Sequence, residues 1–298
     1  MDVGIFGFES TVDRVVEEVA VVAGQGFGSF WVPQIFGFDA LTALAIAGRE
    51  VPEIKLGTSV IPTYPRHPMM LAQQALTVTQ VIGADRLQLG IGLSHKPVVE
   101  GMWGIPFDKP VRHMREYLDL LGPMLHEQRV SAAHETLTAR GQLTIPQATA
   151  PAVLVAALGP QMLKVTGRLA DGTITWMTGA KTIAELTVPT ISEAAAAAGK
   201  PAPQIVVGLP ICITDEVDAA RERAAKEYEI YGTLPSYRAM LDNEGLNGPE
   251  DLALIGDPSE IRDRLAEFES GGMTTFAASA FGSTDERAAT REFLRTLL

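Results

Sequence analysis

Apolar strand patterns alternate with amphipathic helix patterns along almost the whole chain, and this alternation limits the possible folds more than any other feature. In the first repeat, an apolar strand over residues 3–8 precedes a helix whose Val12, Val15, Val16 and Val19 share one face. Further strands are expected over 29–34, 54–62, 87–94, 151–158, 172–179, 204–214 and 274–281. Because a helix pattern follows each of these eight strands, the sequence predicts an α/β fold, a closed parallel (β/α)8 TIM barrel.

Two polar stretches interrupt the alternation, as short insertions after the fourth and seventh strands. Residues 128–150 are expected to form a hairpin, and residues 234–254 precede a helix that Asp257 or Ser259 would cap. The segment 231–245 carries Tyr231, Tyr237 and Met240 to the rim above the seventh strand, where a substrate lid, a dimer contact and plain packing are all compatible with it. No linker rich in serine and proline divides the chain, so residues 1–298 are expected to form a single domain.

Composition excludes several classes of function. The formal net charge of −12 argues against nucleic-acid and anionic-membrane partners, because phosphate groups attract positive surfaces. The single cysteine, Cys212, excludes an intramolecular disulfide framework and lies in an apolar run typical of a buried thiol. No stretch approaches a membrane span or a signal peptide, so a cytoplasmic protein with a small-molecule substrate is expected.

In a TIM barrel, chemistry takes place at the carboxyl ends of the strands, and here those ends are poor in acids and bases. They lack a carboxylate cluster, a GxSxG elbow and a paired set of carboxylates, while His67 and His95 lack metal-site spacing, so no metal is expected. Ile35, Phe36, Trp176 and Met177 supply apolar surface instead. This pattern favours a bound organic cofactor that brings its own reactivity.

Glycines mark two of these strand ends. GIGLSH (90–95) lacks the third glycine and the immediate helix of a dinucleotide-binding motif, so Gly90 and Gly92 are interpreted as places where backbone can approach a planar ring or a phosphate. Gly159 precedes a helix that is expected from Pro160 to about Ala170, and its free N–H groups can receive an anion; the alternative is a helix start without a ligand.

Several motifs in the first 180 residues resemble the luciferase-like monooxygenase superfamily, in particular its coenzyme F420-dependent branch from actinobacteria. The motifs are LGTSVIPTYPRHP (56–68), GADRLQLGIGLSH (83–95), HMREYL (113–118), LVAALGPQML (154–163) and LADGTITWMTG (169–179). Residues 180–298 are supported mainly by the continued alternation. The resemblance implies a barrel, a deazaflavin or flavin ring at the strand ends, and hydride transfer.

The same resemblance assigns cofactor contacts position by position. It implies a non-proline cis peptide at Ser59-Val60 behind the ring, and contacts from the loops after the third, fourth, fifth and sixth strands. The cofactor-binding residues are therefore expected to be Ser59, Val60, Thr63, Arg66, Gly92, Leu93, Ser94, His95, Leu158, Gly159, Pro160, Gln161, Met162, Trp176 and Met177, with Leu158–Met162 at the phosphate end.

Two residues are candidates for catalysis. His95 has a pKa range suited to proton delivery, although it is also interpreted as a loop histidine that contacts the cofactor. Several relatives of the F420-dependent branch carry an aspartate or histidine pair where this chain has Gln34 and Ile35, and the Gln34 amide can still donate and accept hydrogen bonds. Arg66, Lys96 and Lys164 are candidate partners for cofactor anions. No chemistry is assigned to His113, His126 or His134.

Three functions remain compatible with the sequence. The first is an F420-dependent oxidoreductase that moves a hydride between C5 of the deazaflavin and a small organic substrate. The second is an FMN-dependent monooxygenase of the same superfamily, and the third is a cofactor-binding protein without turnover. A homodimer is the expected assembly.

Overall fold

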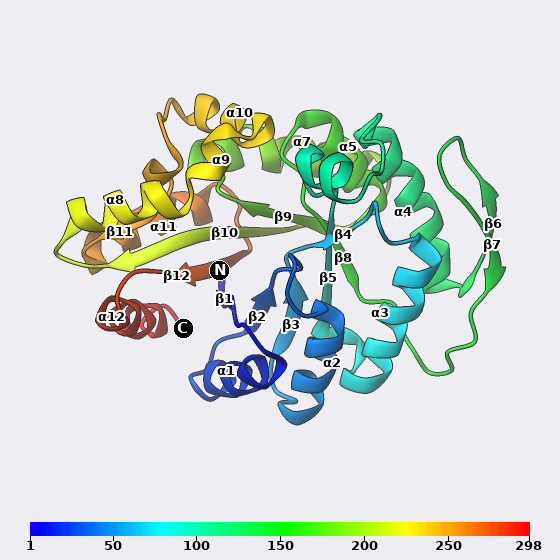
Figure 1. The fold of residues 1–298 in the computed structure, drawn as a ribbon, viewed down its shortest axis with the longest axis horizontal. Coiled ribbons are helices and arrows are strands. Elements are labelled where there is room, and N and C mark those ends of the chain that lie inside the picture. The colour runs from blue at the N-terminus through cyan, green and yellow to red at the C-terminus, as the bar shows by residue number, and fades with distance from the viewer.

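The computed structural model describes residues 1–298, apart from the side chain of Ala84. Its centre is a closed barrel of eight parallel strands, so the predicted TIM barrel is confirmed (Figure 1). In chain order these strands are β1 (Asp2–Phe6), β2 (Ser29–Val32), β3 (Lys55–Thr58), β5 (Leu87–Gly92), β8 (Ala152–Val155), β9 (Gly172–Trp176), β10 (Gln204–Ile213) and β12 (Thr275–Ala280). Pairing of β12 with β1, with Val3 opposite Phe276, closes the ring.

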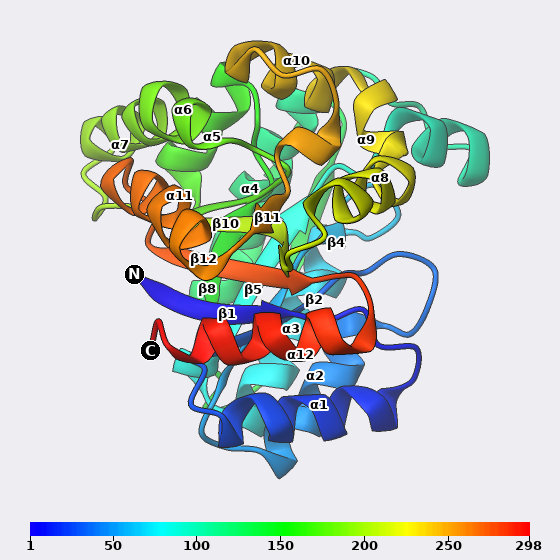
Figure 2. The same cartoon turned by 90° about the vertical axis from the view of Figure 1, so that its left-hand side faces the viewer.

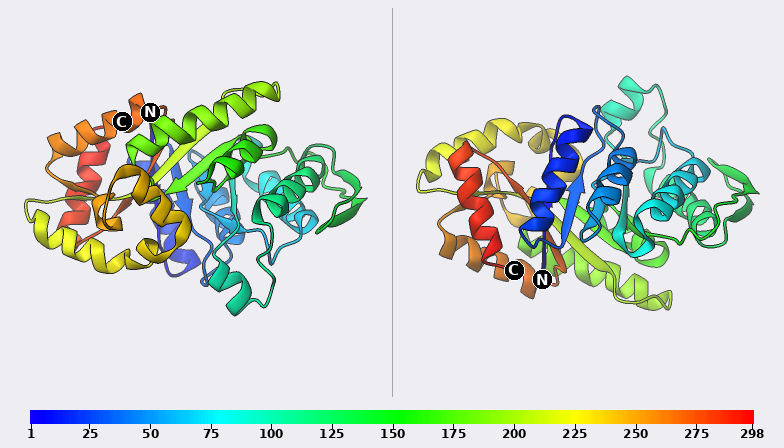
Figure 3. Two further views of the ribbon diagram at one scale, coloured as in Figure 1. Left: turned by 90° about the horizontal axis from the view of Figure 1, so that it is seen from above. Right: turned by 90° about the horizontal axis from the view of Figure 1, so that it is seen from below.

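Helices surround the barrel on the outside, as Figures 1 and 3 show. They are α1 (Val12–Gly24), α2 (Ala40–Glu50), α3 (Pro68–Ile82), α4 (Pro110–His126), α5 (Pro160–Leu169), α6 (Ala180–Thr182), α7 (Val188–Ala197), α8 (Val217–Glu227), α11 (Pro258–Ser270) and α12 (Thr284–Arg295). Their starts follow ordinary capping chemistry, because the Asp39 carboxylate accepts the Thr42 N–H and the Asp257 carboxylate accepts the N–H groups of Ser259 and Glu260. Of the two caps that the sequence predicted for α11, Asp257 and Ser259, Asp257 is the one that caps the helix.

Side chains fill the inside of the barrel. One compact cluster there contains Phe6, Trp31, Leu154, Ile174, Val206 and Ala277, with Val60 packed against it. Trp31 is 2% exposed, and its indole N–H donates to Ser29 Oγ over 2.9 Å. The barrel is therefore a packed core rather than a channel, and chemistry has to take place at its ends.

Several short elements decorate this frame. The strands β6 (Arg129–Ala133) and β7 (Thr138–Gln142) pair antiparallel, which confirms the predicted hairpin. After β10 the chain forms α9 (Glu229–Thr233), α10 (Pro235–Glu244) and β11 (Leu254–Gly256), and β11 pairs with the end of β10. The strand β11 was not predicted. The remaining elements are β4 (Ile61–Pro62), the π-helices η2 (Pro97–Met102) and η3 (Ile183–Thr187), and the 3-10 helices η1 (Ala84–Arg86) and η4 (Pro249–Asp251).

All barrel strands run in one direction, so their carboxyl ends lie at the same end of the molecule. In Figure 2 the arrows of β1 and β12 point toward this end, while both chain termini lie at the opposite end. The predicted site residues follow strands β2, β3, β5, β8 and β9, and the fold therefore brings them to one end of the barrel.

Candidate active site at the carboxyl end of the barrel

The segment between β3 and β4 forms one wall of the candidate site. The Ser59-Val60 peptide bond is cis, as the family resemblance implied. The Ser59 N–H donates to Val32 O over 2.8 Å, and Ile61 pairs with Ile91 of β5. Ser59 and Val60 are half-buried, so this segment is held by both neighbouring strands and keeps part of its surface accessible.

Glycines in β5 make room for that segment. A Cβ atom at Gly90 would lie 1.9 Å from Thr58 O, and one at Gly92 would lie 2.6 Å from Val60 Cγ2. Protein atoms therefore occupy the space that the sequence interpretation had left for a ring or a phosphate, which corrects the reason given for these two glycines. A cofactor contact at Gly92 stays a prediction.

Two predicted contact residues adopt a left-handed backbone directly after barrel strands. Ser94 has φ 61° after β5, and Met177 has φ 51° after β9. Such angles are uncommon for residues with a side chain, and they gather at ligand and active sites. The Met177 side chain is buried, so this residue has only its backbone to offer at the strand end.

An aromatic row crosses the barrel end from His95 to β1. Ring centroids lie 5.9 Å apart for His95 and Tyr237, 4.9 Å for Tyr237 and Tyr231, and 6.2 Å for Tyr231 and Trp176. Trp176 then lies 5.3 Å from Phe6. Both tyrosines come from α9 and α10, so the insertion after β10 covers the end of β9 and reaches the loop after β5.

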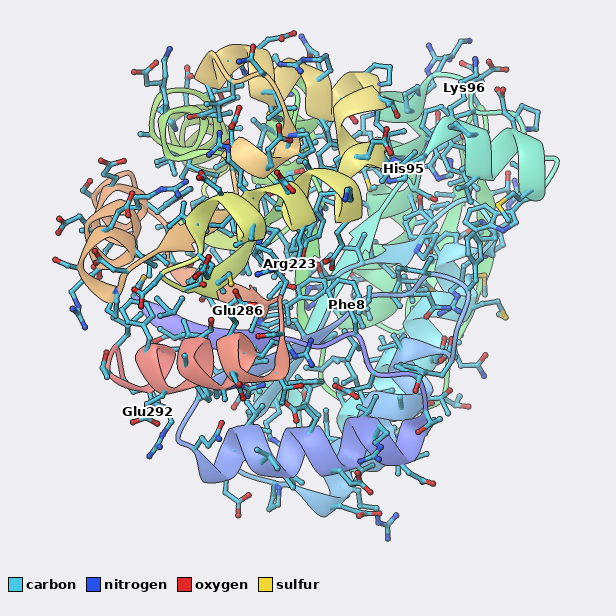
Figure 4. The ribbon with its side chains drawn as sticks, turned by 60° about the vertical axis from the view of Figure 1, so that its left-hand side comes forward. Phe8, His95, Lys96, Arg223, Glu286 and Glu292 are labelled. Carbon is cyan, nitrogen blue, oxygen red and sulfur yellow. The ribbon has the colours of Figure 1, made fainter. Side chains whose placement is uncertain are left out.

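Burial under this cover affects His95. Desolvation lowers the pKa of the His95 imidazole below its ordinary value, which favours the neutral ring at neutral pH. His95 lies in the loop before η2, next to the exposed Lys96 that precedes this helix (Figure 4). Lys96 lies 3.7 Å from Glu100, so a neighbouring carboxylate partly balances its charge.

Exposed apolar side chains follow strands β1 and β2 at this end of the barrel. Ile35 is 60% exposed and Phe36 is 61% exposed, and both had been expected to line the site. Phe8, labelled in Figure 4, is 56% exposed and lies 6.4 Å from the Trp176 ring. The sequence interpretation missed Phe8 because it placed this residue inside the first strand, expected over 3–8, whereas β1 ends at Phe6.

A buried polar contact supports the wall from behind. His113 Nε2 lies 3.0 Å from Thr63 Oγ1, and the Thr63 N–H donates to Gly92 O over 2.9 Å. The Tyr64 ring stacks on His113 with centroids 4.0 Å apart. No role had been assigned to His113, but its side chain connects α4 to the segment that carries the predicted contact Thr63.

Arg66 and Gln34 already have partners within the protein. The Arg66 guanidinium donates to Asp39 Oδ2 over 2.8 Å and to Gln74 Oε1 over 3.0 Å. Burial opposes ionisation of Asp39, yet hydrogen bonds from Arg66 and Thr42 hold its pKa below the ordinary value. Gln34 Oε1 accepts the Ala40 N–H over 3.0 Å. Arg66 is thus held in an ion pair with Asp39, and the side-chain oxygen of Gln34 is occupied by a hydrogen bond from the start of α2.

The start of α5 has a different character. Gly159 precedes α5 without a side-chain cap, and a Cβ atom placed there would meet nothing within 4 Å. Leu158 and Gly159 are half-buried, Pro160 and Gln161 are exposed, and the side chain of Met162 is buried. Free N–H groups at a helix start attract anions, so this end of α5 can receive a phosphate.

Beside this helix start, a groove of about 490 Å³ opens between α4 and α5. It is lined by Val111, Arg112, Arg115, Gln161, Lys164, Val165 and Arg168. Among the residues that the structure describes, no group of three or more His, Cys, Asp or Glu side chains is placed to hold a metal ion. None of the described helices is long and apolar enough to cross a membrane.

Comparison with known proteins identifies one family. It also finds similar proteins that are named for coenzyme F420 and one that was solved with FMN. The family model of luciferase-like monooxygenases matches residues 7–275. A putative coenzyme F420-dependent oxidoreductase of Mycobacterium tuberculosis is 26% identical over 321 residues, which cover 91% of this chain and 91% of that protein.

Solved structures share the fold at lower identity. The coenzyme F420-dependent tetrahydromethanopterin reductase of Methanopyrus kandleri has a TM-score of 0.82 and 20% identity, over 99% of this chain and 97% of that one. The oxygenating constituent of 3,6-diketocamphane monooxygenase of Pseudomonas putida, solved with FMN, has a TM-score of 0.77 and 17% identity, over 100% and 96%.

Proposed function

This chain belongs to the luciferase-like monooxygenase family, and we propose that it is an F420-dependent oxidoreductase that transfers a hydride between C5 of the deazaflavin and a small organic substrate. One observation carries the proposal: the wall at Ser59 and Val60, the loop Leu93–His95 and the uncapped start of α5 lie together at the carboxyl end of the barrel. The match to a putative F420-dependent oxidoreductase over nine-tenths of both chains supports the choice of cofactor.

The residues at this end fit such a cofactor. A tricyclic ring needs an apolar, partly covered surface, and Val60, Trp176 and the rings of Tyr231 and Tyr237 offer one. A phosphate needs N–H donors, and the uncapped start of α5 has them next to the open space at Gly159. In this proposal the backbone of Leu93, Ser94 and Met177 contacts the ring, while Gln161 and its neighbours hold the phosphate end.

Reduced F420, when bound, supplies the hydride, so the protein has to orient the substrate, exclude water and manage one proton. His95 is the residue that we assign to the proton. Its lowered pKa keeps the imidazole neutral at neutral pH, which suits it to take a proton from an alcohol that is being oxidised; in the opposite direction, reduction of a carbonyl, the imidazolium would return that proton to the alkoxide oxygen. Phe8, Ile35 and Phe36 add exposed apolar side chains after β1 and β2 at the same end of the barrel, which favours an uncharged substrate.

An FMN-dependent monooxygenase is the second candidate, because one structural relative of the same fold was solved with FMN. The two cofactors differ at ring position 5. Nitrogen at this position lets reduced FMN react with oxygen, whereas a deazaflavin carries carbon there. A product that contains oxygen from O2 would therefore favour the second candidate.

Titration of the protein with oxidised F420 and, separately, with FMN tests the proposal through quenching of cofactor fluorescence. We expect tight binding of F420 and weak binding of FMN. Oxidation of reduced F420 under anaerobic conditions, screened over aldehydes, ketones, imines and activated alkenes, then tests turnover. Preferential binding of FMN together with oxygen-dependent turnover would overturn the assignment, and binding of F420 without turnover on any class would reduce the protein to a cofactor carrier.

A further inference from the structure

The groove between α4 and α5 is unusually positive for this protein. Among the described residues that line it, four carry cationic side chains, Arg112, Arg115, Lys164 and Arg168, and none is an aspartate or glutamate. The chain as a whole carries 36 acidic and 24 basic side chains. A cluster of this kind on an acidic protein produces a local positive potential, which recruits anions selectively to one place.

Most of these charges are available to a ligand. Among the side chains that the structure describes, Arg115, Lys164 and Arg168 form no ion pair, and all three are exposed. Arg112 differs, because its guanidinium contacts Glu135, which also accepts a hydrogen bond from Lys109 over 2.9 Å. Three cations are therefore free to bind carboxylates.

The groove is continuous with the helix start that we assign to the phosphate. Gln161, in the first turn of α5, lines it at one end. Lys164, Val165 and Arg168 follow on the same face of α5, because positions three, four and seven residues apart are neighbours on a helix surface. At 1.5 Å per residue the stripe from Gln161 to Arg168 extends for roughly 10 Å. Arg112 and Arg115 face it from α4, which packs beside α5 (Figure 1).

We propose that this groove binds the oligoglutamate tail of the deazaflavin cofactor, an inference that rests on the proposed function. In F420 the glutamate residues continue outward from the phosphate, and each added residue brings one more carboxylate. A chain anchored by its phosphate at the start of α5 would enter the groove at Gln161 and meet Lys164, Arg115 and Arg168 in turn. FMN ends at its phosphate and has no group that could reach these cations.

The experiment compares Kd values of four ligands by fluorescence quenching: the deazaflavin riboside without phosphate, and F420 with one, three and five glutamates. For the wild-type protein we expect Kd to fall as the tail lengthens, and the salt dependence of Kd to steepen with each added carboxylate. Equal Kd values for all three forms of F420 would overturn the groove assignment and leave the proposed function intact. Failure to bind any of the four ligands would overturn both.

Charge-reversal variants test whether the groove causes the dependence of Kd on tail length. Arg115→Glu combined with Arg168→Glu should weaken binding of pentaglutamyl F420 by roughly tenfold, since two attractions are lost and two repulsions are added. Affinity for the riboside should stay the same, which also shows that the variant is folded. The matched control combines Arg49→Glu with Lys55→Glu, which are exposed positions outside the groove and make the same change in net charge. Equal weakening in the control would attribute the effect to net charge and overturn the assignment.

Discussion

His113 Nε2 lies 3.0 Å from Thr63 Oγ1, and this buried contact connects α4 to the wall of the candidate site. His113 is only 6% exposed, and burial lowers its pKa to about 4, although the nearby Glu116 carboxylate acts in the opposite direction. The neutral imidazole is therefore the form that this packing accepts.

Stability should consequently fall with acid in a defined window. The pKa of His113 in the folded protein is below the ordinary 6.5, so the unfolded state binds more protons between pH 6.5 and about pH 4. The free energy of unfolding should decrease as the pH falls through this window, by about 2 kcal/mol from this one group between pH 7.5 and pH 5. Urea unfolding at these two pH values measures it.

His113→Phe serves as the comparison for this first prediction. The ring volume is largely kept while the titrating group and the contact with Thr63 are lost, so stability at pH 7.5 should drop by about 1 kcal/mol. The difference between pH 7.5 and pH 5 should shrink by most of the amount assigned to the imidazole. An equally steep acid dependence in the variant would show that other groups cause it.

The second prediction concerns the glycines of β5. Gly92→Ala would place a Cβ atom 2.6 Å from Val60 Cγ2, so Val60 has to move, and we expect a loss of about 1–3 kcal/mol in stability. Because Val60 belongs to the wall that we assign to the cofactor ring, cofactor affinity should fall as well. Gly90→Ala would be worse, since its Cβ would meet Thr58 O, a backbone atom, at 1.9 Å.

A matched control for these variants is Gly24→Ala. Gly24 is the last residue of α1, and a Cβ atom there would meet nothing within 4 Å. Alanine in a helix should raise stability by up to about 0.5–1 kcal/mol and leave cofactor affinity unchanged. Denaturant titration and fluorescence quenching on the three variants give both quantities. A Gly92→Ala protein as stable as the wild type would show that Val60 has free space to move into.

The sequence predicted the structure that follows from local patterns. It did not predict the structure that depends on contacts between segments far apart in the chain. Apolar runs predicted all eight barrel strands, because burial on both faces of a parallel sheet leaves a continuous apolar stretch. The strand β11 has three residues and is defined by its pairing with β10, so it left no pattern of its own.

The same distinction holds for the candidate site. Ser94 and His95 follow a recognisable strand end, and Gly159 precedes a recognisable helix. Arg66 and His113 depend on distant partners, since Asp39 and Thr63 lie 27 and 50 residues away in sequence. Without an observed contact, Arg66 appeared to be a free cation and His113 an ordinary helix residue.

The third prediction follows from the contact between His95 and Tyr237, whose ring centroids are 5.9 Å apart. Burial is what lowers the pKa of His95, so removing the covering ring should let water in and raise that pKa toward 6.5. NMR titration of the His95 ring protons should give a higher pKa in Tyr237→Ala than in the wild type. Tyr237→Phe keeps the ring and should leave the pKa unchanged.

The same pair of variants tests whether His95 handles the proton during turnover. If it does, the acidic limb of the pH profile for alcohol oxidation with oxidised F420 has to follow the pKa of the ring, because protonation removes the neutral base. In Tyr237→Ala that limb should therefore move to higher pH together with the NMR pKa, while in Tyr237→Phe neither should move. His95→Ala should lower turnover by at least about tenfold and change the Kd of F420 only slightly, since general acid–base groups contribute rate rather than affinity. An acidic limb that stays in place while the NMR pKa shifts would remove His95 from the proton transfer and leave it as a loop residue that packs under α10.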